Sequence, residues 1–408
     1  MTEIPAVGNV PARRHRRRAI CADQPAVAQS PGYVDGMTTL AAVQLGADEA
    51  RLGKRPELLE RKWQRMARSP FAFLRGASAL WAKALSREPK LLRGLPGVAS
   101  LVGDLHLENV GVFRTARGVT FHVNDFDETF DGPIAFDVVR LLTSTLLARA
   151  ELQVSGVKVL ELGWAMLDGH DVGLRNGVVR PPAFVKELVA EVNALPAAAV
   201  LRKKVDEAGR LVRSREKTPE APVSVRRQVG AALAAWKPSM PIPEGALEVL
   251  DVTRRIAGTG SLGVERLLVL VKGDEAPWLL EVKEVRGSAF SSKVASADQL
   301  VSVMQRVLPK PPACFGASRL GRLPVVITKL GAKEDKLGVD ELPAEALLSY
   351  ARYLGFLVGE IHRRGGASTR WSAAHRASVL DGAQHLAGLH ETAFLRFCDV
   401  VFDRFGAQ

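Results

Sequence analysis

Two clusters of acidic and amide side chains flank a short β-hairpin pattern in the first third of the chain. Residues 103–109 (GDLHLEN) precede the hairpin and residues 124–128 (NDFDE) follow it. Between them, the apolar runs 110–114 and 119–123 are joined by a turn that contains glycine, a pattern typical of two antiparallel strands. Divalent metals prefer oxygen ligands held on a rigid support. The sequence therefore predicts a metal-dependent catalytic centre at this hairpin.

Length and composition set the broad class of the protein. A chain of 408 residues, 47% hydrophobic and 25% charged, is long enough for two lobes with separate cores. No apolar run approaches the roughly 18 residues of a membrane span, and the start of the chain lacks the apolar stretch of a secretory signal. Cys21, Cys314 and Cys398 are widely spaced, which argues against a disulfide framework or a zinc site. We expect a cytoplasmic protein without a membrane span.

The net charge of +12 is concentrated in part near the N-terminus, where residues 13–18 read RRHRRR. The surrounding Pro/Ala-rich segment predicts a disordered basic tail over residues 1–45. Such a run can attract nucleic acid or an anionic membrane without sequence specificity. Because no aromatic residues are interleaved with the arginines and no nucleic-acid motif is present, we favour a solvated tail and do not expect nucleic-acid binding.

The remaining chain predicts an α+β protein in three parts. Residues 46–245 are mostly helical apart from the hairpin, residues 246–345 are rich in β-strand patterns, and residues 346–408 are helical again. In the β-rich part, strand patterns at 264–272 and 278–283 are separated by a Gly-Asp turn. These periodicities predict a helical lobe, completed by the C-terminal helices, and a smaller β-rich lobe.

A glycine-rich loop precedes the first of these strands. It reads GTGSLG over residues 258–263, and Lys283 ends the next strand twenty residues after Gly263. In a dinucleotide-binding fold such glycines join a strand to a helix, whereas in protein kinases they join two antiparallel strands that cover ATP. The strand pattern favours the second arrangement. The candidate phosphate-binding residues are Gly258, Gly260, Ser261, Gly263 and Lys283; taken alone, Lys283 would be a surface lysine.

The hairpin supplies the complementary groups in the order that a kinase uses. There, an Asp accepts the proton of the substrate hydroxyl, an Asn five residues later binds metal, and a further Asp binds magnesium. Asp104, Asn109 and Asp125 reproduce this order. We therefore assign Asp104 as the catalytic base, with Asn109 and Asp125 as magnesium ligands.

Further polar residues support this site, and each allows more than one role. His106 either braces the loop or binds metal, and Asp127 with Glu128 binds a second metal or a cationic substrate or is solvated. Asp137, at the start of an apolar helix, either caps that helix or accepts hydrogen bonds from the loop amides. Arg75 binds phosphate or forms an ordinary ion pair.

These motifs together resemble the aminoglycoside and choline phosphotransferase branch of the protein-kinase-like superfamily. Several stretches also resemble a bacterial family known as domain of unknown function 2252, over most of residues 50–365; they are 66–77, 103–111, 124–137, 258–263 and 282–284. The resemblance implies a two-lobed kinase-like fold that uses ATP and Mg²⁺ to phosphorylate a hydroxyl of a small molecule or a protein.

The order of the motifs differs from that of kinases, which place the glycine loop and its lysine before the catalytic loop. Here these elements follow it by about 150 residues, and a circular permutation explains the order. The amphipathic helix 347–362 resembles the helix that precedes the catalytic loop in kinases. Permutation is tolerated where the original termini lie close together at the surface.

One departure from the kinase pattern leaves alternatives open. Kinases pair the lysine with a Glu on the next helix, but residues 297–308 contain none, and Asp298, Gln299 or Gln305 would have to substitute. Besides a phosphotransferase, the pattern is compatible with a nucleotide-binding pseudokinase or regulatory module, and with AMP transfer from the same fold. A basic nucleic-acid-binding protein is the non-enzymatic alternative.

Overall fold

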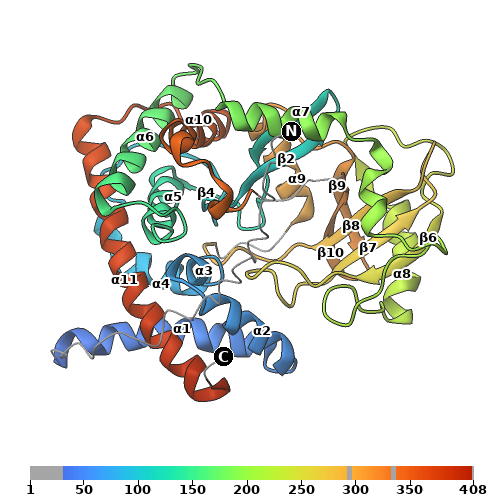
Figure 1. Ribbon diagram of the computed structural model, residues 1–408, viewed down its shortest axis with the longest axis horizontal. Coiled ribbons are helices and arrows are strands. Elements are labelled where there is room, and N and C mark those ends of the chain that lie inside the picture. The colour runs from blue at the N-terminus through green and yellow to red at the C-terminus, as the bar shows by residue number, and fades with distance from the viewer. Residues whose placement is uncertain (1–30, 292–295, 332–336, 407–408) are drawn as a thin grey trace, which may run out of the picture.

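The computed structural model describes residues 31–291, 296–331 and 337–406, which form a mixed α+β structure. The helices are α1 (Pro31–Leu52), α2 (Pro56–Met66), α3 (Pro70–Leu74), α4 (Ser78–Arg87), α5 (Ala135–Leu147), α6 (Gly156–Leu174), α7 (Ala183–Ala194), α8 (Val223–Ala234), α9 (Ala297–Val307), α10 (Leu347–Arg364) and α11 (Ala373–Phe405). The strands are β1 (Val98–Leu101), β2 (Val110–Thr115), β3 (Gly118–Val123), β4 (Phe130–Pro133), β5 (Lys237–Pro238), β6 (Val249–Arg254), β7 (Arg266–Val271), β8 (Trp278–Glu284), β9 (Phe315–Leu320) and β10 (Leu323–Lys329). Figure 1 shows most helices gathered on one side and the large sheet on the other.

Helices α6 and α10 pack with their backbones in contact because glycines line both sides of the crossing. A Cβ on Gly169 would lie 1.8 Å from the Arg352 carbonyl oxygen, and one on Gly355 would lie 1.9 Å from that of Met166. Gly173 and Gly359, each one turn further along, are also crowded by the opposite backbone, with nearest carbonyl oxygens 2.4 and 2.2 Å from an added Cβ. Only glycine permits such an approach, and it brings side chains at the ends of both helices into direct contact.

The large sheet has six strands in the order β5-β9-β10-β8-β7-β6, and every neighbouring pair is antiparallel. Side chains alternate between its two faces. One face packs against α8, where Val229 and Leu233 contact the core formed with Val269 and Leu280. Lys283 lies opposite Arg266 and two residues from Glu281, so these three polar side chains share the face away from α8.

The sheet also packs against, and pairs with, residues that the sequence analysis assigned to the helical part. Residues 197–245 were predicted to belong with residues 46–196, yet α8 packs on the sheet and β5 pairs with β9. Val200 and Leu201 pack against the opposite face of the sheet. A boundary at residue 245 is therefore too late, because prolines end the local helices but do not reveal which core their apolar residues join.

The predicted disordered tail is shorter than expected. Helix α1 begins at Pro31, so residues 31–45 are helical, whereas the arginine run 13–18 lies outside the described residues. Gln44 and Asp48 on this helix are buried and hydrogen-bonded, with Lys62 and Trp63 of α2 also bound to Asp48. The amino-acid composition suggested disorder here because composition carries no information about tertiary contacts of this kind.

Within the described chain, no helix has the length and apolar character required to cross a membrane.

The hairpin that the sequence predicted is present as β2 and β3, paired from Val110↔Val123 to Thr115↔Gly118. Strand β1 pairs with β4, so Gly132 and Pro133, residue types that favour turns, form part of a strand. The two polar clusters that flank the hairpin thus lie between two short two-stranded sheets.

The long helix α11 offers a test of how the helices are held together. Phe397 is fully buried and its ring lies 4.8 Å from that of Phe73, whereas Phe402 on the same helix is 55% exposed. We expect Phe397→Ala to lower the free energy of unfolding by about 3–5 kcal/mol and Phe402→Ala to change it by less than about 0.5 kcal/mol. Urea denaturation of both variants measures this; equal losses would contradict the packing described.

Candidate active site

The loop that carries Asp104 is anchored by the buried carboxylate of Asp137. Asp137, on the first turn of α5, accepts hydrogen bonds from the backbone N–H groups of Val102 at 2.8 Å and Gly103 at 2.9 Å. Gly103 has a φ of +90°, and a Cβ there would lie 2.1 Å from the carbonyl oxygen of Glu128. Of the two roles predicted for Asp137, the structure shows the bond to the loop amides, and the glycine brings both polar clusters together.

Two histidines extend this anchor. The Nε2 of His362, at the end of α10, lies 3.1 Å from Asp137 Oδ2, and its Nδ1 lies 2.9 Å from Nε2 of His170 on α6. Burial, with a smaller contribution from His362, holds the pKa of His170 well below its usual value, so His170 is neutral at physiological pH. The glycine-lined crossing of α6 and α10 thus positions His362, which contacts Asp137, the residue that accepts hydrogen bonds from the loop amides.

Asp104 forms an ion pair with Arg140 of α5. Arg140 is fully buried, lies 4.8 Å from the ring centre of Trp81, and also donates to the carbonyl oxygen of Leu74. Phe290 covers the guanidinium from another side at 5.8 Å. This cation holds the Asp104 carboxylate in place, and its own burial is offset by the paired charge and by the aromatic faces.

Asn109 has a side-chain oxygen that lacks a hydrogen-bond partner among the described residues. Its Nδ2 donates to the backbone oxygen of Asp104 at 2.5 Å, which orients the amide, while its Oδ1 is buried without a hydrogen-bond partner. A buried polar atom without a partner is costly in free energy. Together with the Asp125 carboxylate, this oxygen suits a hard divalent cation that completes its shell with water or phosphate oxygens. No group of three His, Cys, Asp or Glu residues among those described is arranged to hold a metal by itself.

The sheet contributes a lysine to the same place. Lys283 Nζ on β8 lies 3.8 Å from Asp125 Oδ1 and forms an ion pair with Asp127. Burial lowers the pKa of Lys283, but Asp125 and Asp127 outweigh burial and raise it overall, so the lysine stays charged. Residues more than 150 positions apart in sequence therefore meet in one site, as the motif analysis required.

The glycine loop connects β6 and β7, which are antiparallel neighbours, as predicted. Gly258 and Gly263 have φ values of +77° and +88°, which favour glycine at both ends of the loop. The Ser261 hydroxyl donates to the carbonyl oxygen of Ala257 and accepts a bond from Arg266. At the tip, Gly260 lies against the backbone of Arg75: an added Cβ would be 3.1 Å from its oxygen.

Other predicted residues take the more ordinary of their possible roles. Arg75 forms an ion pair with Glu108 at 2.6 Å, and His106 Nδ1 accepts a hydrogen bond from the backbone of Glu108, which braces the loop. In the described part of the chain, no residue of α9 forms an ion pair with Lys283. The carboxylates beside Lys283 come from the hairpin instead of from α9, where Asp298, Gln299 and Gln305 were expected to substitute.

Sequence reasoning missed several residues of this site. Arg140 and His170 lie within apolar helical patterns that read as core, and His362 was noted only as part of a helix end. Glu128 accepts a hydrogen bond from Ala289 N at 2.6 Å, which joins the hairpin to the segment after β8. A charged residue in an apolar helix, as at Arg140, is the one signal that could have been followed, because it requires a partner when buried.

Glu128 generates a pH prediction. Burial, and then the charge of Asp104, raises its pKa from 4.5 to about 7. Since the folded protein binds this proton more tightly than the unfolded chain, stability is lost as the pH rises from about 4.5 to about 7. Glu128→Gln should flatten that decline in urea denaturation, while Glu244→Gln, at an exposed position, should not. A decline as steep in Glu128→Gln as in the unaltered protein would contradict the assignment.

Comparison with known proteins places the chain in a family. Residues 54–400, more than four fifths of the chain, match the model of the family described as "Uncharacterized protein conserved in bacteria (DUF2252)". No curated protein and no solved structure matches the chain significantly. The match covers both clusters of the hairpin, the glycine loop and Lys283. The chain therefore belongs to the DUF2252 family of bacterial proteins.

Proposed function

We propose that this protein is an ATP- and Mg²⁺-dependent phosphotransferase that acts on a hydroxyl group. The observation that carries the proposal is the meeting of Lys283 with Asp125 and Asp127. In a kinase, the corresponding lysine contacts the phosphates of ATP and the corresponding aspartate binds magnesium, so the two must lie together. A glycine loop connects the antiparallel strands β6 and β7, and β7 pairs with β8, the strand that bears Lys283.

The residues of the hairpin have distinct roles in this reaction. Asp104 accepts the proton of the acceptor hydroxyl as its oxygen bonds to the γ-phosphorus and the bond to the ADP oxygen breaks. Asn109 and Asp125 are the candidate Mg²⁺ ligands, and bound Mg²⁺ supplies positive charge that offsets the charge of the phosphates. Arg140 keeps the Asp104 carboxylate oriented while the acceptor binds. Positioning of this kind accounts for most of the catalysis in phosphoryl transfer.

The backbone near Asp104 supports a circularly permuted kinase-like fold. The N–H of Ser100 on β1 donates to the carbonyl oxygen of Gly365, immediately after α10, at 3.2 Å. Further along, Trp371 Nε1 donates to the carbonyl oxygen of Pro96 at 2.9 Å. The end of α10 thus lies beside the strand that leads into the catalytic loop, although Ser100 and Gly365 are 265 positions apart in sequence. A chain that ran from α10 directly into β1 would have the kinase order.

The reaction is tested with labelled ATP. The purified protein is incubated with Mg²⁺, γ-labelled ATP and a bacterial metabolite extract, beside Asp125→Ala, Lys283→Ala and the surface control Lys272→Ala. We expect label transfer to fall at least about 100-fold in the first two variants and to be unchanged in the control. Binding of ATP without transfer would instead indicate a pseudokinase, and incorporation from α-labelled ATP would indicate AMP transfer.

The metal assignment has its own test. Asn109→Leu keeps the approximate volume of the side chain but removes the oxygen proposed to bind Mg²⁺. At an ATP concentration 100 times the dissociation constant, the unaltered protein should gain about 2.7 kcal/mol of stability, and the part of this gain that needs Mg²⁺ should be lost in the variant. Thermal unfolding with ATP, with and without Mg²⁺, measures it. An equal Mg²⁺-dependent gain in Asn109→Leu would refute the role of Asn109.

A further inference from the structure

One face of α2 directs arginines towards the sheet. Arg55, which precedes the helix, donates to the carbonyl oxygen of Gly263 at 2.9 Å, and Arg65 donates to that of Gly258 at 2.7 Å. Between them, Arg61 donates to the carbonyl oxygen of Glu216 at 2.5 Å. We name Arg55, Arg61, Arg65 and the exposed Arg68 the arginine face. Three of these arginines donate to backbone carbonyl oxygens, and two of those oxygens, of Gly258 and Gly263, belong to the glycine loop.

These hydrogen bonds leave the positive charge uncompensated. None of the four arginines forms an ion pair with a carboxylate of the described chain, and a backbone carbonyl carries no net charge. Burial, followed by repulsion from Arg61, Arg68 and Arg75, lowers the pKa of Arg65. A guanidinium has five N–H donors, and each of the three bonded arginines uses one of them on a carbonyl. The arginine face therefore holds several like charges with donors to spare.

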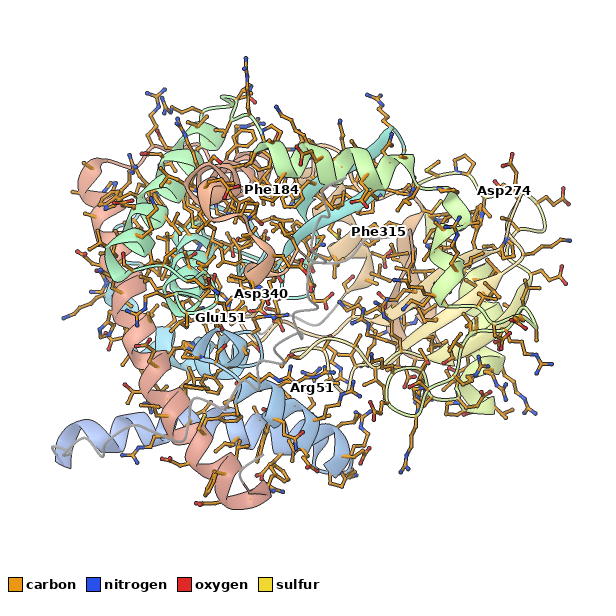
Figure 2. The ribbon with its side chains drawn as sticks, viewed as in Figure 1. Arg51, Glu151, Phe184, Asp274, Phe315 and Asp340 are labelled. Atoms are coloured by element: carbon orange, nitrogen blue, oxygen red, sulfur yellow. The ribbon has the colours of Figure 1, made fainter. Side chains whose placement is uncertain are left out.

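Two neighbouring arginines add buried donors without partners. Arg51, at the end of α1, and Arg75, beside Gly260, each have a buried Nε that forms no hydrogen bond. Figure 2 shows Arg51 between the N-terminal helices and the loops that lead to the sheet. Burial, and after it repulsion from Arg286, lowers the pKa of Arg51. Arg286 also donates to the carbonyl oxygen of Gly263. Positive groups thus lie at both ends and at the tip of the glycine loop.

We propose that the arginine face binds a phosphate or carboxylate group of the acceptor, so that the acceptor of this protein is an anion. Guanidinium groups suit such oxyanions because they donate paired hydrogen bonds and stay charged. The ATP phosphates do not account for the arginines. Backbone N–H groups of a glycine loop contact phosphates, whereas the arginine face binds the carbonyl oxygens of Gly258 and Gly263.

The position of the arginines relative to Asp104 assigns this group to the acceptor. The charge of Arg75 acts on Arg65, and Arg75 itself connects the tip of the glycine loop to Glu108 of the catalytic loop. The donor phosphates are assigned instead to Lys283 and Asp125, which lie together. In the described chain the hydrogen bonds of Arg55, Arg61 and Arg65 go to backbone carbonyl oxygens and not to Lys283 or Asp125, so we assign an anion held there to the acceptor and not to the donor. This assignment to the acceptor rests on the proposed phosphotransferase function; the anion site itself does not.

The site is tested by calorimetric titration of the full-length protein with inorganic pyrophosphate at constant ionic strength. Mg²⁺ and a non-hydrolysable ATP analogue are kept saturating, so that the donor site is filled. The double variant Arg61→Gln/Arg65→Gln removes two charges but keeps side-chain N–H donors for the carbonyl oxygens. Arg61→Lys/Arg65→Lys keeps the charges, and Arg93→Gln/Arg370→Gln removes two exposed charges outside the arginine face.

We expect the glutamine pair to weaken pyrophosphate binding at least about tenfold, with less than about threefold change in the lysine pair and in the distant control. Absent binding in the presence of the ATP analogue, or equal binding in the glutamine pair, would overturn the proposal. The labelled-ATP experiment separates the two proposals: if no label is transferred but pyrophosphate binds through the arginine face, the phosphotransferase reading fails and the anion site stands.

Discussion

The Asp137 carboxylate is the interaction on which the candidate site depends. It is fully buried, and it accepts hydrogen bonds from two backbone N–H groups of the loop before Asp104. It also contacts the ring of His362. A buried carboxylate is tolerated only when hydrogen bonds replace its hydration, so the loop, α5 and α10 are coupled through one side chain. The glycine contacts between α6 and α10 set the position of His362, and through it the position of the loop that carries Asp104.

The charges around this anchor are arranged in opposed groups. Five carboxylates lie in the two clusters at the ends of the hairpin, those of Asp104, Glu108, Asp125, Asp127 and Glu128. Arg140, Arg75 and Lys283 form ion pairs with the first four of them. Like charges this close repel strongly in a partly buried site. The cations offset this repulsion, while burial, and after it the charge of Asp104, raises the pKa of Glu128. The proposed divalent cation would add positive charge beside Asp125, and the buried side-chain oxygen of Asn109 would be available to it.

Local patterns predicted the elements of the site well. The hairpin, the strand of Lys283, the glycine loop between antiparallel strands and the helix α10 all have the predicted type and nearly the predicted bounds. Each is specified by residues close in sequence: alternating apolar side chains, glycines at positive φ, and a helical stripe. The helical extent of α1, the strand β4 and the association of α8 with the sheet were not predicted, because each depends on a partner distant in the chain.

By itself, the sequence determined which chemical groups are available and on which kinds of element they stand. It specified an α+β chain with Asp104, Asn109 and Asp125 on a hairpin and Lys283 on a strand, since short-range periodicity and turn chemistry suffice for that. Tertiary structure alone decided that Lys283 lies against Asp125, that Arg140 holds Asp104, and that arginines of α2 surround the glycine loop. These contacts join segments from about 35 to about 200 residues apart, and they arise from burial and charge pairing across the whole fold, which no local pattern encodes.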